Sequence, residues 1–221
     1  AAAGLVAVPP FTIEEVEEQN WVQLTQSQFD PIRITDRLWI VPTWHTAPDA
    51  DAINLILDPG MAFGTGSHPT TRLCLEWLID EVAPGVSVLD YGCGFGILAI
   101  AAAKLGASEV TGVDIDEKAV ATAADNAANN GVSLHLQVSA KPLAGTFQRV
   151  VANILTNPLK MLAPLLAARV APGGKLALSG VLEAQADEVI EAYAPYIALR
   201  VGATHEGWVR LEGERPEQDV Q

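Results

Sequence analysis

The feature that most constrains this chain is the alternation, after residue 85, of short apolar segments with helix-length ones. Val86–Asp90 and Val110–Asp114 have the length and apolar character of buried strands. The segments that follow them, Ile97–Leu105 and Glu117–Asn129, are predicted helices. Such alternation is typical of a mostly parallel sheet with helices on both faces. The sequence therefore predicts an α/β fold.

The rest of this region continues the pattern. Further strands are predicted at Leu134–Val138, Arg149–Ile154 and Lys175–Ser179, with helices at Pro158–Val170 and Glu183–Tyr193 and a turn at 172–174. The last two predicted strands, Ile197–Ala203 and Trp208–Glu212, have no helix between them, so we expect an antiparallel hairpin at one edge. Together these segments predict a Rossmann-like, seven-stranded, doubly wound sheet with an antiparallel edge strand.

The preceding part of the chain is organised differently. A helix is predicted at Thr12–Phe29, a hairpin within 32–41, a strand at Ile53–Leu57, a glycine-rich loop over 60–69 and a helix at Thr70–Val82. The first helix starts with an acidic run, Glu14, Glu15, Glu17 and Glu18. Acidic side chains favour the first turn of a helix, so the run predicts a solvated helix start. An acidic patch that attracts a basic protein is the alternative.

Composition excludes several functions. The chain of 221 residues carries 13 basic and 27 acidic side chains, a net charge of −14, which argues against direct nucleic-acid binding. No apolar run approaches the roughly 20 residues of a membrane span. Cys74 and Cys93 form neither a disulfide framework nor a metal-ligand pattern, which fits a reducing cytosol. We expect a cytoplasmic protein with no metal, for which a basic protein partner stays open.

A glycine loop joins the first strand of the alternating region to its helix. Gly92, Gly94 and Gly96 lie where open α/β sheets bind ligands. A dinucleotide fingerprint needs its third glycine at the position of Ile97, so a pyrophosphate cradle is poorly matched. The carboxylate of Asp90 would repel a pyrophosphate, but it suits a ligand that carries an ammonium and a sulfonium.

Two further acidic residues lie at the end of the next predicted strand and just beyond it. Asp114 ends that strand 22 residues after Gly92, where an acid accepts hydrogen bonds from ribose hydroxyls. Asp116 is the predicted N-cap of the following helix. With Asp90 and the three glycines, Asp114 predicts a site for S-adenosylmethionine.

Four segments together resemble one family. They are Leu57–Thr71, Asp90–Gly96, Val113–Asp116 and Ala152–Leu155, and they are similar to the ribosomal protein L11 methyltransferases (the PrmA family). The stretch from Arg37 to Trp44 also resembles the family's interdomain segment, and the likeness runs from about Thr12 to Leu211. It implies a class I methyltransferase that trimethylates amines of ribosomal protein L11. The family's small N-terminal substrate-recognition domain would then be represented by at most residues 1–11.

The resemblance therefore implies three parts. Residues 1–52 would be a remnant of the N-terminal domain plus an interdomain linker, 53–215 the catalytic domain and 216–221 a flexible tail.

Several side chains are candidates for the site. Asn153 follows an apolar strand beside the glycine loop, so its amide is expected to orient the acceptor amine and to border the cofactor; capping a helix that starts near Thr156 is the alternative. Ile115 is expected to line the adenine site and Phe63 to wall the methyl-transfer pocket. The resemblance places Thr71 at the carboxylate end of the cofactor. For His68, a loop-shaping role is favoured over that of a base.

These observations predict an S-adenosylmethionine-dependent protein N-methyltransferase. Its substrates would be lysine side chains, and an N-terminal amine, of ribosomal protein L11, and we expect a monomer. One alternative is a methyltransferase for a different amine or a small molecule. Another is a cofactor-binding module without turnover. Ile97 weighs against a third, a nicotinamide dehydrogenase.

Overall fold

The computed structural model describes residues 29–58 and 67–217. The predicted helix at Thr12–Phe29, apart from its last residue, lies outside the described residues, as do the acidic run, Phe63 and most of the glycine-rich loop. None of the helices in the described ranges has both the length and the apolar character needed to cross a membrane.

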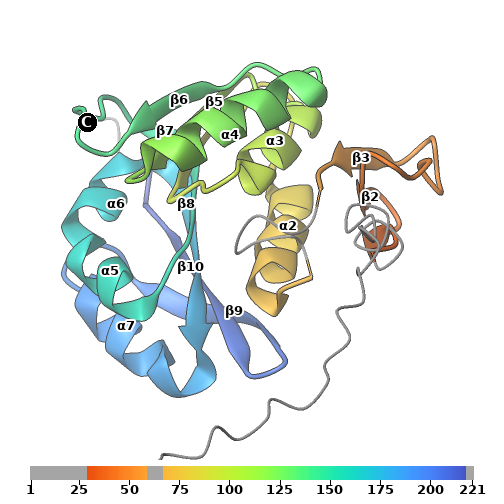
Figure 1. Cartoon of the computed structure of the whole chain (residues 1–221). Helices are drawn as coiled ribbons and strands as arrows, with labels where there is room; N and C mark the ends of the chain where they lie inside the picture. The colour runs from red at the N-terminus through yellow and green to blue at the C-terminus, as the bar shows by residue number, and fades with distance from the viewer. Residues whose placement is uncertain (1–28, 59–66, 218–221) are drawn as a thin grey trace, which may run out of the picture.

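The described chain contains the predicted seven-stranded sheet (Figure 1). Its order is β6-β5-β4-β7-β8-β10-β9, and the first five of these strands run parallel. β10 lies antiparallel to both β8 and β9, which confirms the expected hairpin at one edge. The strands are β4 (Ser87–Tyr91), β5 (Glu109–Asp114), β6 (His135–Val138), β7 (Phe147–Asn153), β8 (Val170–Leu182), β9 (Leu199–His205) and β10 (Trp208–Glu214).

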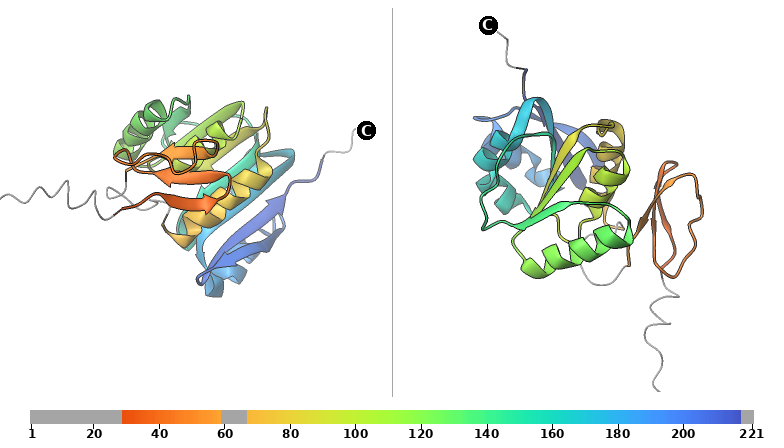
Figure 2. Two further views of the ribbon diagram at one scale, coloured as in Figure 1. Left: turned by 90° about the vertical axis from the view of Figure 1, so that its right-hand side faces the viewer. Right: turned by 90° about the horizontal axis from the view of Figure 1, so that it is seen from above.

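Helices cover the sheet on both faces (Figures 1 and 2). One face carries α2 (Pro69–Glu81), α3 (Ile97–Lys104) and α4 (Glu117–Asn129). The other carries α5 (Thr156–Met161), α6 (Ala163–Arg169) and, after the 3-10 turn η1 (Glu183–Gln185), α7 (Ala186–Tyr193). Successive residues of a strand point to opposite faces of the sheet. In β7, Val151 packs in the core beneath the first set of helices, whereas its neighbours Val150 and Ala152 pack in the core beneath the second set. A doubly buried sheet explains why these strands are apolar throughout.

Two details differ from the predictions. In place of the single helix expected at Pro158–Val170, the structure has two helices, α5 and α6. The first begins at Thr156, earlier than expected, and Leu162 separates it from the second. Pro164 lies in the first turn of the second helix, and it has no N–H to donate to the carbonyl four residues before it. The expected turn at 172–174 lies inside β8, where the register with β7 jumps from Phe147↔Val170 to Arg149↔Lys175.

A second, three-stranded sheet lies beside α2 and α3 (Figure 2). It consists of β1 (Ile32–Thr35) and β2 (Leu38–Val41), the predicted hairpin, and β3 (Ile53–Ile56), which pairs in parallel with β2. The Asn130 side chain joins β3 to the end of α4, because its oxygen accepts from Ile56 N and its nitrogen donates to Ile56 O. The domain boundary expected after residue 52 stays a prediction, although β3 and its strand partner lie on opposite sides of it.

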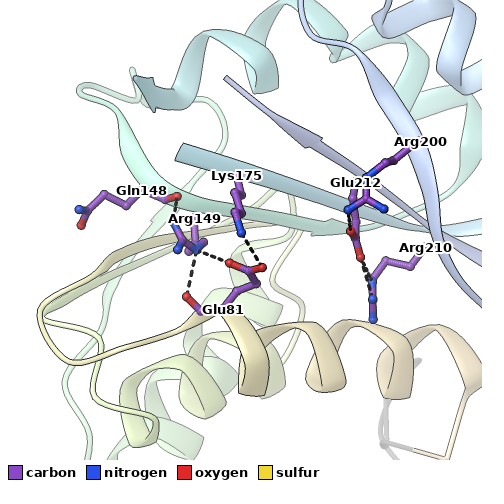
Figure 3. A network of polar contacts seen from close by, with 7 residues as sticks. All are labelled: Glu81, Gln148, Arg149, Lys175, Arg200, Arg210 and Glu212. Carbon is purple, nitrogen blue, oxygen red and sulfur yellow. Dashed lines mark hydrogen bonds and ion pairs between the residues drawn. The ribbon is translucent and has the colours of Figure 1, made fainter. Parts of the chain in front are cut away.

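Charged side chains fasten α2 to the sheet (Figure 3). Glu81, the last residue of α2, accepts hydrogen bonds from Lys175 at 2.8 Å and pairs with Arg149 at 3.2 Å. Arg210 of β10 is buried and donates to the Leu73 carbonyl at 2.6 Å and to Glu212 at 2.7 Å. β7, β8 and β10 therefore all hold this helix in place.

Replacing Arg210 should destabilise the protein much more than replacing Arg200, which donates to the same carboxylate of Glu212. Arg210→Ala removes a buried donor from the Leu73 carbonyl and both hydrogen bonds to Oε1 of the largely buried Glu212, so we expect a loss of about 2–4 kcal/mol of unfolding free energy. The Arg200 side chain is 76% exposed, and Arg200→Ala should cost about 0–1 kcal/mol. Urea unfolding followed by circular dichroism measures both, and equal losses would contradict the assignment.

Candidate active site

The turn from β4 into α3 lies at the carboxyl edge of the sheet, next to the point where the strand order reverses between β4 and β7. Gly92, Gly94 and Gly96 have φ angles of 78°, 52° and 90°, a region that other residues rarely adopt. A Cβ at Gly92 would also overlap the side chain of Ile154, which follows β7. Backbone angle and packing both require glycine in this loop.

Asp90 lies in β4 beneath the loop and is 1% exposed. Its Oδ2 accepts a hydrogen bond from Ala99 N in α3 at 3.1 Å, whereas its Oδ1 is buried and has no partner among the described residues. Burial raises the pKa of this carboxyl to about 7; the Ala99 N–H opposes the shift and the charge of Asp114 adds to it. This buried oxygen is therefore a polar atom that the described residues leave unsatisfied.

Asp114, at the end of β5, holds the loop from the other side. Its Oδ2 accepts from Gly94 N at 2.8 Å and its Oδ1 from Asp116 N at 2.9 Å. Asp116 caps α4 by accepting from Lys118 N, which confirms the N-cap prediction. The side chain of Ile115, between the two acids, is 86% exposed and offers an apolar surface beside the carboxylate.

Asn153 ends β7 and pairs with Ser179 of β8. Within the described residues the Asn153 side chain forms no hydrogen bond, so its amide is available. The N-cap of α5 is Leu155, so the alternative that Asn153 caps this helix is wrong. Gly180 was not predicted from the sequence. It lies inside β8, directly after the predicted strand Lys175–Ser179, and a Cβ there would overlap the Ile154 carbonyl.

The first turns of α2 bring two more predicted residues to the sheet. Thr71 is buried, and its Oγ1 has no partner within the described ranges. His68 is the N-cap of α2: its Nδ1 accepts from Thr70 N at 3.3 Å, and its ring stands edge-on to Trp208 with centroids 4.8 Å apart. These contacts support the loop-shaping role of His68.

Cavity shape alone would not locate this site. A cavity of about 210 Å³ lies between the end of α2 and β8–β10, lined among others by Trp77, Lys175 and Arg200, and none of its lining residues belongs to the glycine loop. In residues 29–58 and 67–217, no group of His, Cys, Asp and Glu is arranged to hold a metal ion.

The residues present fit S-adenosylmethionine. A glycine loop open to close approach, an acid at the end of β5, and the orphaned oxygens of Asp90 and Thr71 match a ligand that has ribose hydroxyls, a sulfonium and an amino-acid end. With the seven-stranded topology, this site defines a class I S-adenosylmethionine-dependent methyltransferase.

Comparison with known proteins narrows the class. The sequence model of the ribosomal protein L11 methyltransferase (PrmA) family matches residues 2–216, and the chain belongs to this family. The chain is 63% identical to a ribosomal protein L11 methyltransferase of Dechloromonas aromatica, over 98% of this chain and 73% of the relative. A second relative with the same name, from Thiobacillus denitrificans, is 61% identical, over 96% and 72%.

Solved structures agree with this assignment. The crystal structure of a ribosomal protein L11 methylase from Lactobacillus delbrueckii subsp. bulgaricus has a TM-score of 0.78 and 32% identity, covering 86% of this chain and 99% of that one. A magnesium protoporphyrin IX methyltransferase from Synechocystis, solved with bound S-adenosylmethionine, has a TM-score of 0.51 and 26% identity, covering 72% and 86%. S-adenosylmethionine is the cofactor of this protein.

The packing at Gly92 can be tested against Gly94, where a Cβ would meet nothing within 4 Å. Gly92→Ala combines a strained φ with overlap on Ile154, so we expect it to lower the unfolding free energy by about 2–4 kcal/mol. Gly94→Ala carries only the backbone strain, about 1–2 kcal/mol. Chemical denaturation without cofactor measures both losses; a Gly94 variant as unstable as the Gly92 variant would contradict the packing argument.

The pKa of Asp90 predicts a pH dependence of stability. Its folded-state value of about 7 exceeds the ordinary 3.8, so between these values the folded protein keeps a proton that the unfolded chain releases. Asp90 therefore makes the protein less stable as pH rises through this window. Asp90→Asn should remove that contribution, so without cofactor the variant gains stability relative to the original protein as pH rises from about 4 to about 7. A difference in unfolding free energy that stays constant with pH would contradict the shift.

Proposed function

We propose that this protein methylates lysine side chains, up to trimethyllysine, and an N-terminal amine of ribosomal protein L11. The relatives' names support the acceptor protein. The observation that carries the reaction is the unengaged amide of Asn153, at the end of β7 and next to the glycine loop.

We propose cofactor-binding roles for the residues gathered at this edge. Gly92, Gly94 and Gly96 let the cofactor approach the backbone, Asp114 accepts from its ribose hydroxyls and Ile115 covers its adenine. Asp90, through its orphaned Oδ1, faces the ammonium and sulfonium end, and Thr71 donates to the carboxylate. We also retain Phe63, outside the described residues, as a wall of the methyl-transfer pocket. Bound S-adenosylmethionine supplies a methyl group activated by a positively charged sulfur.

The acceptor amine must arrive as the neutral base, because only then does its nitrogen carry a lone pair. A free lysine has a pKa of about 10.4, and desolvation at the site lowers that value. In the first two transfers, the Asn153 side-chain oxygen accepts an N–H of the neutral amine and so directs the lone pair at the methyl carbon. Positioning of this kind can supply roughly 7–11 kcal/mol of the barrier reduction. Transfer neutralises the sulfonium. After each of the first two transfers the methylated nitrogen is a cation that loses a proton to solvent; after the third it has no proton to lose and keeps its charge as a quaternary ammonium.

We propose residues 53–215 as the catalytic unit of a monomeric, cytoplasmic protein, with 1–52 as the linker and domain remnant and 216–221 as a tail. A ribosomal acceptor supports the cytoplasmic location, and the net charge of −14 supports an acceptor that is protein and not bare nucleic acid.

Incubation of the protein with isolated L11 and tritiated S-adenosylmethionine tests the proposal, with mass spectrometry to count the methyl groups on each amine. Label in L11 lysines is the expected result. Cofactor binding without any labelled L11 would favour the alternatives, a different amine or small-molecule acceptor, or a binding module without turnover.

Asn153→Ala should lower kcat by about 10²–10³-fold, because it removes the group that orients the amine. The Kd for S-adenosylmethionine, measured by calorimetry, should change by less than about threefold if the amide acts mainly on the acceptor. Asn157→Ala, at an exposed position of α5, is the matched control and should leave both quantities unchanged. Equal losses in kcat and cofactor affinity would instead assign Asn153 to cofactor binding.

A further inference from the structure

Two leucines are exposed at the sheet edge that carries Asn153. Leu155 is 70% exposed and lies two residues beyond the end of β7, and Leu182 is 42% exposed and ends the neighbouring strand β8. Most of the other leucines of the described chain are buried in one of the two cores. Two exposed leucines beside the proposed reaction centre are a candidate contact surface, which needs further support from neighbouring groups.

A shared neighbour joins the two backbone segments that carry these leucines. The Oε1 atom of Gln185 accepts from Thr156 Oγ1 at 2.9 Å and from Leu182 N at 3.3 Å. Thr156 directly follows Leu155 and is itself buried, so one side chain joins the segments that leave β7 and β8. Gln185 therefore links the two segments that carry the exposed leucines.

Two acidic residues flank these leucines. Glu183 follows Leu182, and its N–H donates to the Gly207 carbonyl at 3.0 Å, which brings the β9–β10 turn alongside. Glu206 is exposed in that turn. Neither carboxylate forms an ion pair within the described residues, whereas Glu188 nearby pairs with Lys160 at 2.7 Å. We call Leu155, Leu182, Glu183 and Glu206 the acceptor rim.

We propose that the acceptor rim docks a basic, lysine-bearing segment of the methyl acceptor. Leu155 and Leu182 contact the aliphatic stem of the target lysine, whose nitrogen reaches Asn153, while Glu183 and Glu206 attract neighbouring basic residues. A lysine has an apolar four-carbon stem that ends in an amino group. The stem matches the two leucines, and the amino group matches the amide of Asn153 beyond them. The inference rests on the proposed function, because it names how that acceptor is held.

The acidic charge of the acceptor rim favours a basic segment of the acceptor over a second copy of this chain as the docking partner. Two copies that met at this rim would oppose acidic side chains on molecules that each carry a net charge of −14. A basic segment gains attraction from the same charges, and this attraction speeds encounter at low salt.

Two double variants test the rim in the full-length protein, in steady-state methyl transfer to L11. Glu183→Lys with Glu206→Lys should raise the KM for L11 by about tenfold at low salt, with the effect shrinking at high salt. Leu155→Gln with Leu182→Gln should raise it by about tenfold at every salt concentration. In both, the Kd for S-adenosylmethionine should stay within about twofold, because the rim touches only the acceptor.

The matched control is Glu109→Lys with Asp125→Lys. It makes the same change in charge at exposed positions, at the amino end of β5 and on α4. It should change the KM for L11 by less than about twofold.

Rim variants that fold by circular dichroism yet match the control in KM would overturn the proposal. So would a sedimentation coefficient that shows the original protein to be a dimer that the rim variants dissociate. No label in L11 with the original protein would overturn the proposed function, and the rim assignment with it.

Discussion

The turn between β4 and α3 is the constraint on which the site depends. Its glycines adopt positive φ angles, and the loop is held by hydrogen bonds from Gly92 N and Cys93 N to the Val113 carbonyl and from Gly94 N to Asp114. β5 thus fixes the loop from one side, and Ile154 packs against Gly92 from the other. Because neighbours on both sides restrain the loop, its backbone is preorganised for a ligand at the carboxyl edge of the sheet.

The position of α2 is the second requirement, since this helix carries Thr71. Arg210 reaches the Leu73 carbonyl across 137 residues of sequence, and Trp208 packs on the His68 cap. The antiparallel β9–β10 hairpin therefore closes the sheet and also supports the first turns of the helix that carries Thr71. It also brings Glu206 to the same edge.

Sequence patterns were sufficient where the cause is local. Apolar periodicity predicted the strands and most helices, and the Asp116 cap follows from a side chain bonding its own helix start. The break before Pro164 was equally readable, because the missing N–H is a property of that residue. The pairing of β3 with β2 could not be predicted from the sequence, because an apolar strand such as β3 could have paired with an edge strand of either sheet. The orphaned oxygens of Thr71 and Asp90 also escaped prediction, because they arise from packing with residues distant in sequence.

The α/β architecture, the glycine loop and the acids at its strand ends follow from the sequence alone, because backbone conformation and strand periodicity depend on neighbouring residues. Which groups are shielded from water depends instead on how the chain packs. Burial by α2 and α3 raises the pKa of Asp90, while Leu155 and Leu182 stay exposed although they are as apolar as the buried leucines of the core. Solvent access depends on which segments, distant in sequence, pack against a side chain. The protonation and exposure of the site residues are therefore fixed only in the folded chain.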